Sequence, residues 1–200
     1  MASSIKPKPR KRAPTPRLLP LIDAARIAQR LPALAREVEE KIKLRERPIA
    51  IVVLQGGFIF AADLLRSFSP RFEIDVAFVR CESYGAQTQS SGRVMLLQDI
   101  DPAIDLHGRT VLLIDDILDT GLTLKFLTEH LRRRGASRVH TCVLLCRSGR
   151  PAVQNTSWGF EIGSEFVVGY GLDYAGKYRH LPGLCVLDQS PAKRKRAVLR

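Results

Sequence analysis

Apolar residues near the start of the chain are spaced for a helix. Five of them are three or four positions apart, at Leu31, Leu34, Ala35, Val38 and Ile42. This spacing predicts a helix with one buried face. Asp23 can cap a short helix just before it, and Pro48 is expected to end the helical segment.

Further along the chain, short continuous apolar runs alternate with helical patterns. The runs predict buried strands at residues 49–54, 74–81, 93–98, 110–115, 138–146, 166–168 and 185–187. Helices are expected at 58–68 and between Thr120-Gly121 and a stop at Gly135. Residues 82–92 contain almost no apolar side chain, which predicts a long, mobile surface loop of the kind that often carries function.

Strands that are apolar on both faces and alternate with helices predict an α/β fold. Its central sheet is expected to be mostly parallel and flanked by helices on both faces. Ligands bind to such sheets at the carboxyl ends of the strands. A chain of 200 residues suits one compact domain. We expect that domain at residues 18–190, between basic, disordered tails at 1–17 and 191–200.

The net charge of +12 is concentrated in these two tails. The first 17 residues carry six lysines and arginines and the last ten carry five, with no acidic residue in either segment. Because the body between the tails is almost neutral, we expect a soluble domain with solvated ends. Weak binding of RNA, ribosomes or acidic lipid by the tails is the less favoured alternative.

Targeting and redox signals favour a cytoplasmic protein. No apolar run is long enough to span a membrane, and residues 1–20 lack the apolar stretch of a secretory signal. The four cysteines, Cys81, Cys142, Cys146 and Cys185, show no C-x-x-C spacing. Cys142 and Cys146 have the even spacing of one face of a strand. We therefore expect buried free thiols in preference to a metal site.

The strongest chemical signal is residues 111–123, where a buried apolar strand ends in carboxylates and leads into a Gly turn and a helix. Backbone N–H groups and threonine hydroxyls at the start of that helix can surround a phosphate. The paired acids Asp115 and Asp116 suit ribose hydroxyls or a Mg²⁺ shell. A simple helix-capping cluster would leave two of the three acids without a role. We assign a ribose 5-phosphate to Asp115, Asp116, Leu118, Asp119, Thr120, Gly121, Leu122 and Thr123.

This segment resembles the motif with which type I phosphoribosyltransferases bind phosphoribosyl pyrophosphate. Other segments resemble the hypoxanthine-guanine members of that family in the same order: Leu54-Gln-Gly-Gly57, Ser83-Tyr84, Phe160-Glu-Ile162, 166–174 and Tyr178-Arg179. The resemblance covers about residues 20–188. It implies a purine-salvage enzyme that transfers the phosphoribosyl group to hypoxanthine or guanine, giving IMP or GMP and pyrophosphate. It also implies a small hood formed by N- and C-terminal segments, and a homodimer or homotetramer.

The resemblance assigns the pyrophosphate to two glycines, a loop and an arginine. A Gly turn brings backbone amides close to phosphate because glycine has no Cβ. Gln55 stands where the family often has Lys, so a charge contact is missing there. The loop at 82–92 would close over the site and exclude water. The implied residues are Gln55, Gly56, Gly57, Ser83, Tyr84 and Arg179.

The resemblance also implies which residues bind the purine. Phe166 would stack on the base, the backbone of Val167 would read its edge, and Arg147 would donate to the exocyclic oxygen where the family commonly has Lys. The implied purine-binding residues are Arg147, Phe166, Val167 and Asp173, and the implied Mg²⁺ ligands are Asp115, Asp116 and Asp173.

The reaction implied by the family proceeds as pyrophosphate leaves the ribose with oxocarbenium character, while Mg²⁺ neutralises the leaving group. Asp119 would be catalytic, holding or accepting a proton at N7 of the purine.

Two other classes of protein share parts of this pattern. A phosphorelay receiver domain also has paired acids after a strand, but near the start of the domain, whereas Asp115 and Asp116 lie past the middle of this chain. A non-enzymatic relative that binds the same ligand and regulates RNA or DNA is supported by the basic tails alone. The presence of Asp119, Asp173, Arg179 and the Ser83-Tyr84 loop favours the enzyme.

Overall fold

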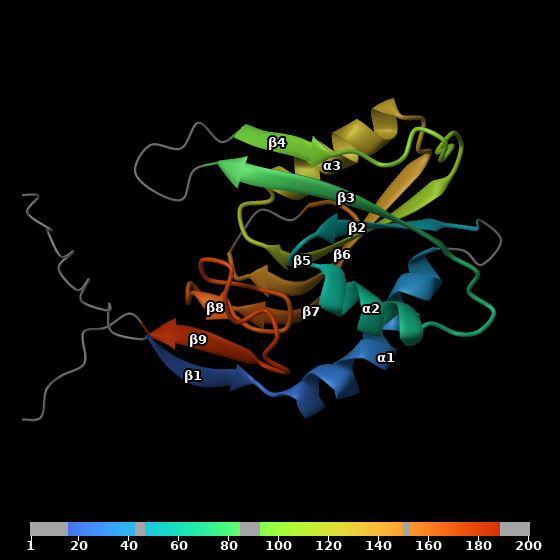
Figure 1. The fold of residues 1–200 in the computed structure, drawn as a ribbon. Helices are drawn as coiled ribbons and strands as arrows, with labels where there is room; N and C mark the ends of the chain where they lie inside the picture. Colours follow the sequence, from blue (N-terminus) through green and yellow to red (C-terminus); the bar gives the residue numbers. More distant parts are fainter. Residues whose placement is uncertain (1–15, 43–46, 85–92, 150–152, 189–200) are drawn as a thin grey trace, which may run out of the picture.

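The computed structural model describes residues 16–42, 47–84, 93–149 and 153–188. Within these ranges the chain forms helices and two β-sheets (Figure 1). The helices are α1 (Ala24–Lys41), α2 (Phe58–Arg66) and α3 (Leu122–Arg133). The strands are β1 (Arg17–Ile22), β2 (Ile49–Leu54), β3 (Asp75–Tyr84), β4 (Arg93–Gln98), β5 (Thr110–Leu118), β6 (Arg138–Arg147), β7 (Thr156–Ile162), β8 (Val167–Val168) and β9 (Leu184–Asp188).

The larger sheet has the strand order β4-β3-β2-β5-β6-β7. Strands β3, β2, β5, β6 and β7 run parallel, and β4 pairs with β3 in the antiparallel direction. The parallel strands therefore end at one edge of the sheet, on the left in Figure 1. The predicted α/β fold with a mostly parallel sheet is confirmed.

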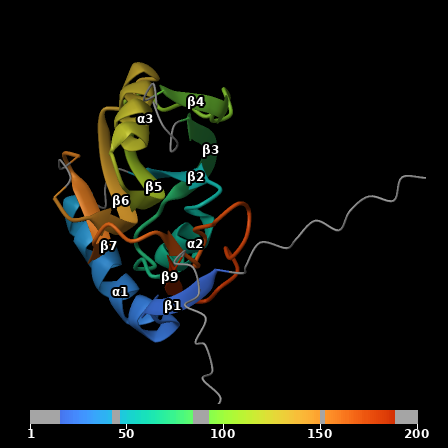
Figure 2. The ribbon, with the colours of Figure 1, turned by 90° about the vertical axis from the view of Figure 1, so that its left-hand side faces the viewer.

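A second, antiparallel sheet has the order β1-β9-β8, and its strands β9 and β1 lie at the bottom of the molecule (Figures 1 and 2). In it, Arg17 is opposite Asp188, so segments from the two ends of the described chain are paired. This sheet is the expected hood. Residues 1–15 and 189–200, which include most of the predicted tails, lie outside the described ranges.

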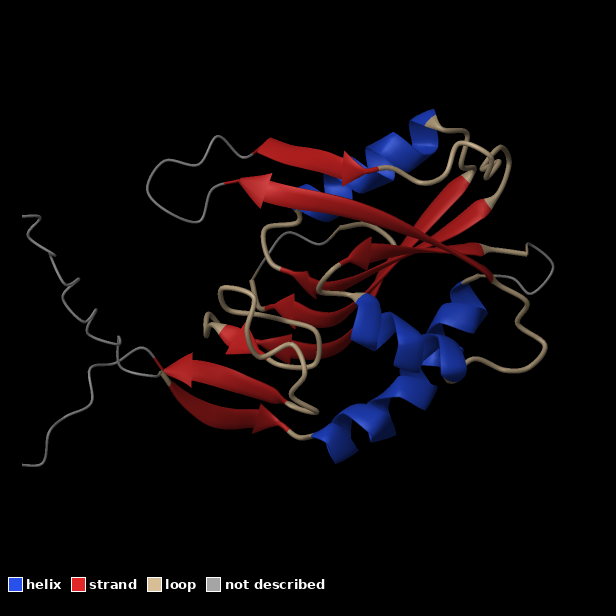
Figure 3. Ribbon diagram, viewed as in Figure 1, coloured by secondary structure: helices blue, strands red, loops and turns tan. Residues whose placement is uncertain are grey.

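Side chains along the central strands alternate between two apolar layers. In β2, Ala50 and Val52 belong to the layer that contains α1 and α2, whereas Ile51 and Val53 belong to the layer that contains α3. Figure 3 shows the helices on the two sides of the sheet. Strands covered on both faces are apolar at every position, which explains the continuous apolar run of β2.

The first helix differs from its prediction. It is one continuous helix, α1, whose start is capped by Asp23, with the carboxylate accepting from the N–H of Arg26 at 2.8 Å. Pro48 does not end it. The helix stops at Lys41 because Ile42 takes an extended backbone conformation and buries its side chain completely. Pro32 lies inside the helix on its exposed face.

Two strands are longer than their apolar runs. β5 continues through its acids to Leu118 because β6 runs beside it, with Ile117 opposite Leu145. β3 continues to Tyr84, which pairs with Arg93 of β4. Residues 85–92, the rest of the predicted mobile loop, lie outside the described ranges.

The cysteines are free thiols among the described residues, as predicted, but Cys142 alone is fully buried. Cys142 and Cys146 do not share a face of β6, which corrects the prediction from their spacing. Leu144 and Leu145 both pack in the layer of α1 and α2, so the alternation of the strand shifts by one position between the two cysteines. No helix in the described part of the chain is long and apolar enough to cross a membrane.

Candidate active site

The predicted phosphate-binding segments meet at the carboxyl edge of the larger sheet. β2, β5 and β6 are neighbours in that sheet. The Gly turn follows β2, the acids end β5, and Arg147 is the last residue of β6. The parallel sheet therefore brings together three segments that lie far apart in the sequence.

Glycine is required where the turn after β2 approaches the acids. A β-carbon on Gly56 would lie 1.7 Å from Oδ2 of Asp116, and one on Gly57 would lie 2.9 Å from the carbonyl oxygen of Val53. The backbone of the turn thus lies directly against the side chain of Asp116, and a larger residue at position 56 would displace that carboxylate. Gln55 is exposed beside it.

The paired acids are largely withdrawn from water. Asp115 is buried and Asp116 is half-buried, and Oδ1 of Asp115 accepts the N–H of Asp116 at 2.9 Å. Burial and the neighbouring negative charge raise the pKa of Asp115 well above its usual value. Burial also raises the pKa of Asp116, although the charge of Arg179 opposes that shift. Ligands that donate hydroxyl hydrogen bonds or bring positive charge would stabilise the ionised form of these two carboxylates.

A thiol lies near the same acids. Burial, together with the charges of Asp115 and Asp116, raises the pKa of Cys81 to about 12. The thiol is therefore protonated at neutral pH and is a poor nucleophile.

The loop after β5 leads into the start of α3. Gly121 adopts a left-handed backbone conformation, with φ of 78°, at the N-cap position, and its carbonyl oxygen accepts the N–H of Lys125 at 2.9 Å. The hydroxyl of Thr120 accepts the N–H of Leu122 at 3.4 Å. The first turn of α3 thus presents backbone N–H groups beside Thr123 at the positive end of the helix, as anion binding requires.

The two residues assigned to the purine's functional groups contact each other. Nε of Arg147 lies 2.8 Å from Oδ1 of Asp119, and their side chains are 15% and 49% exposed. Nη1 of Arg147 also donates to the carbonyl oxygens of Gly163 at 2.7 Å and Glu165 at 3.0 Å. The arginine therefore joins the loop after β5 to the segment that precedes Phe166, a link that the sequence did not indicate.

Phe166 is 45% exposed and is therefore not a core residue. Its ring meets the ring of Tyr174 edge to face, with centroids 5.7 Å apart. Tyr174 was not predicted as a site residue, although its aromatic side chain within 166–174 was a signal for it. Val167 is buried in β8, where it pairs with Val186.

Asp173 and Arg179 form an ion pair, with Nη2 of Arg179 2.7 Å from Oδ1 of Asp173. Oδ2 of Asp173 also accepts the N–H of Gly176 at 2.6 Å. The described residues contain no group of three or more His, Cys, Asp or Glu that could hold a metal ion. The structure therefore does not bring Asp173 together with Asp115 and Asp116 as one ready-made cluster.

Ser83 and Tyr84 are the last residues of β3, paired with Val94 and Arg93. β3 is the neighbour of β2 in the sheet. The side chains of Ser83 and Tyr84 lie outside the described part of the structure. Their assignment to pyrophosphate stays a prediction.

Comparison with known proteins gives a consistent family. A family model for the phosphoribosyl transferase domain matches residues 21–175. The hypoxanthine-guanine phosphoribosyltransferase of Dictyostelium discoideum is 37% identical over 171 residues, covering 84% of this chain and 94% of that protein. The enzyme of the same name from Bacillus subtilis is 45% identical over 142 residues, covering 70% and 77%. A crystal structure of a hypoxanthine-guanine phosphoribosyltransferase from Bacillus anthracis is 38% identical, covers 84% of this chain and 97% of that chain, and superimposes with a TM-score of 0.74.

Replacing Asp115 by Asn should stabilise the free protein at neutral pH. The folded state holds the proton of Asp115 to higher pH than the unfolded chain, so the wild-type protein loses stability as the pH rises above the usual value of 3.8. Asparagine does not titrate. Asp115→Asn should therefore raise the melting temperature by about 2–4 °C at pH 8, for a gain on the order of 1 kcal/mol, and by almost nothing at pH 4.

Scanning calorimetry at pH 4, 6 and 8 measures this difference. The exposed Asp105→Asn is the matched control and should show no pH-dependent gain. A gain for Asp115→Asn that is equal at pH 4 and pH 8 contradicts the burial of a charged carboxylate.

Proposed function

Since the chain belongs to the phosphoribosyltransferase family, we propose that it catalyses purine salvage by transferring the 5-phosphoribosyl group of phosphoribosyl pyrophosphate to hypoxanthine or guanine. The products are IMP or GMP and pyrophosphate. The observation that carries this proposal is the contact of the Gly56 turn with Asp116 beside the start of α3. We infer that the glycine turn, the two carboxylates and the helix N-terminus that follows them along the chain bind one substrate.

The ribose 5-phosphate binds at the start of α3. Backbone N–H groups from Leu118 to Thr123 donate to the phosphate oxygens, and the positive end of the helix favours the negative charge. Asp115 and Asp116 accept from the ribose hydroxyls. A hydroxyl donor suits these carboxylates because burial has removed much of their water.

Pyrophosphate binds between the turn at Gly56 and Gly57 and the guanidinium of Arg179. The turn contributes backbone amides, and Arg179 contributes a planar fork that can bind two phosphate oxygens. The positive charge of Arg179 already acts on Asp116, which supports its position near this turn. Gln55 adds a neutral side chain here, and the assignment of Ser83 and Tyr84 to pyrophosphate is part of this proposal.

The purine stacks on the exposed ring of Phe166 and lies next to the backbone of Val167. Arg147 donates to the oxygen at position six, and Asp119 holds or accepts the proton at N7. Because these two side chains already lie 2.8 Å apart, both can reach adjacent atoms of one purine ring.

Mg²⁺ fits the donor set at the acids. Carboxylate oxygens are hard ligands, and Mg²⁺ is usually held by one or two carboxylates together with substrate phosphates, so a complete protein cage is not required. Asp115 and Asp116 would hold it on the protein side, and Asp173 is a further candidate at the paired Arg179. When bound, the metal neutralises charge on the pyrophosphate.

We also propose that the protein is cytoplasmic and a homodimer or homotetramer. An apolar face on β3 and β4, formed by Val76, Phe78, Met95 and Leu97, is between 43 and 48% exposed. Val76 and Phe78 lie on the same side of the sheet as α1 and α2, beyond the strands that these helices cover. A second copy of this chain would bury that face.

The direct test of the function is a spectrophotometric assay of the purified protein with phosphoribosyl pyrophosphate, Mg²⁺ and each purine base in turn. Hypoxanthine and guanine should be converted, and excess chelator should abolish turnover. Inactivity with all bases would refute the enzymatic function, and full turnover in chelator would refute the metal requirement.

Asp119→Asn should lower kcat by on the order of 10²-fold, with little change in binding of phosphoribosyl pyrophosphate, because acid-base groups typically contribute that much. Asparagine has the same shape but cannot take the proton of N7. Steady-state kinetics and equilibrium binding separate the two effects. An unchanged kcat removes Asp119 from catalysis.

Adenine should be a poor substrate because a guanidinium has donors only, and the amino group at position six of adenine is also a donor. Its kcat/KM should be lower than that of hypoxanthine by at least about 10², since unpaired buried donors cost about 1–3 kcal/mol each. Arg147→Ala should weaken use of hypoxanthine and guanine and leave binding of phosphoribosyl pyrophosphate almost unchanged. Equal kcat/KM for adenine and hypoxanthine would defeat the assignment of Arg147.

Phe78→Glu should convert the oligomer to monomers, because association would have to desolvate a charge in an apolar contact. Sedimentation equilibrium measures the mass. Leu19→Glu, at an exposed apolar position in the hood, is the control and should leave the mass unchanged. A monomeric wild-type protein contradicts the proposed interface.

A further inference from the structure

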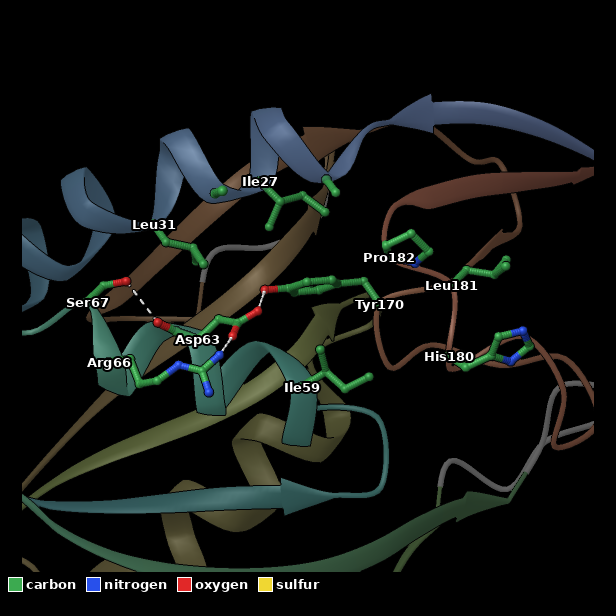
Figure 4. A pocket seen from close by; sticks show the side chains of 12 residues that line it. Ile27, Leu31, Ile59, Asp63, Arg66, Ser67, Tyr170, His180, Leu181 and Pro182 are labelled. Atoms are coloured by element: carbon green, nitrogen blue, oxygen red, sulfur yellow. Dashed lines mark hydrogen bonds and ion pairs between the residues drawn. The ribbon is translucent and has the colours of Figure 1, made fainter.

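A hydrogen bond ties the segment after β8 to helix α2. The hydroxyl of Tyr170 donates to Oδ2 of Asp63, and the other oxygen of that carboxylate pairs with Arg66 (Figure 4). Tyr170 is 6% exposed, so its hydroxyl requires a partner inside the protein. Asp63 supplies it from a different element of the fold.

The tyrosine belongs to the buried core, and part of it borders a pocket. The pocket has a volume of about 540 Å³ and lies between α1, α2 and the segment at 180–182, with Ile27, Leu31 and Ile59 among its apolar lining (Figure 4). On the side of the pocket the ring has fewer protein neighbours than a fully packed core side chain. The bond to Asp63 therefore adds to packing in fixing the orientation of the ring.

The backbone at Tyr170 needs the same support. Its φ of 49° is in the left-handed region, between Gly169 at 100° and Gly171 at 102°. A left-handed conformation at a non-glycine residue is strained and persists where surrounding contacts enforce it. The anchored side chain is one of those contacts.

This turn is in direct contact with the residues assigned to pyrophosphate. A β-carbon on Gly171 would lie 2.2 Å from the carbonyl oxygen of Gly56, so the two backbones touch. The carbonyl oxygen of Gly171 also accepts Nη1 of Arg179 at 2.7 Å, and its N–H donates to the carbonyl oxygen of Arg179 at 3.0 Å. Gly171 thus connects the Gly turn and the arginine, and it is the next residue after Tyr170.

We propose that Tyr170 and Asp63 are positioning residues. Their hydrogen bond holds the Gly56 turn and Arg179 in the relative positions that bind the pyrophosphate half of phosphoribosyl pyrophosphate. This inference rests on the function proposed above. Tyr170 and Asp63 are not among the groups assigned to the substrate, and they act through Gly171. The purine-binding side chains Phe166 and Arg147 make no direct contact with this bond.

Steady-state kinetics of Tyr170→Phe test the proposal. The variant keeps the ring and loses the hydroxyl. Its KM for phosphoribosyl pyrophosphate should rise about tenfold, the expected scale for losing one hydrogen bond to a charged group. The KM for hypoxanthine should stay within about twofold of the wild-type value, since Phe166 and Arg147 are untouched.

Variants of Asp63, the hydrogen-bond acceptor of Tyr170, provide a second test. Asp63→Asn keeps an oxygen that accepts from Tyr170 and should behave almost like the wild-type protein. Asp63→Ala should match Tyr170→Phe, and the double variant should be no worse than either single one. Arg66→Ala is the matched control, because it removes the ion pair with Asp63 and leaves the bond to Tyr170 in place.

Calorimetric binding of inorganic pyrophosphate with Mg²⁺ provides a second measurement that does not depend on turnover. Binding should weaken about tenfold in Tyr170→Phe. An unchanged affinity for pyrophosphate, or an equal rise of both KM values, overturns the positioning role. If the wild-type protein binds pyrophosphate but transfers no phosphoribosyl group, the proposed function fails and the binding comparison still decides the role of Tyr170.

Discussion

Two adjacent carboxylates buried at the end of β5 constrain the rest of the site. Asp115 and Asp116 repel each other and have lost much of their water, so the fold must surround them with groups that lower this cost. The turn of Gly56 lies against one of them without a side chain, and the positive charge of Arg179, near the C-terminal end of the domain, acts on it. A substrate that supplies hydroxyls and a cation relieves the same penalty. The cost of burying these carboxylates thus becomes affinity for such a ligand.

The sequence predicts well what a single short stretch contains. The apolar strand of residues 111–114, its acids and the Gly121 turn were predicted together, and the structure keeps them together. The glycine pair after β2 was weaker as a signal. Its role is visible only when β2 and β5 pair side by side and bring Gly56 to Asp116.

Contacts between distant segments could not be predicted. Nothing in the residues near Arg147 indicates that its guanidinium reaches Asp119 and two backbone carbonyls at once. The contact of Gly171 with Gly56 likewise depends on the path of the whole chain. β1 and β7 were not predicted, because they too depend on contacts with another segment. β1 contains Pro20 and is mostly exposed, and β7 contains Gly159, so neither shows a continuous apolar run, and both owe their form to a neighbouring strand.

Because β1 pairs with β9, the hood and the carboxylate end of β5 are completed at different stages of synthesis. The carboxylates, the Gly turn and the start of α3 are all present once the chain has been made as far as Arg133. The hood closes only after Leu184–Asp188 emerges, since that strand pairs with residues from the opposite end of the domain. Such a long-range pairing requires closure of a very large loop and forms late. The segment proposed to bind the 5-phosphate is therefore synthesised before the strand that completes the hood beside Val167.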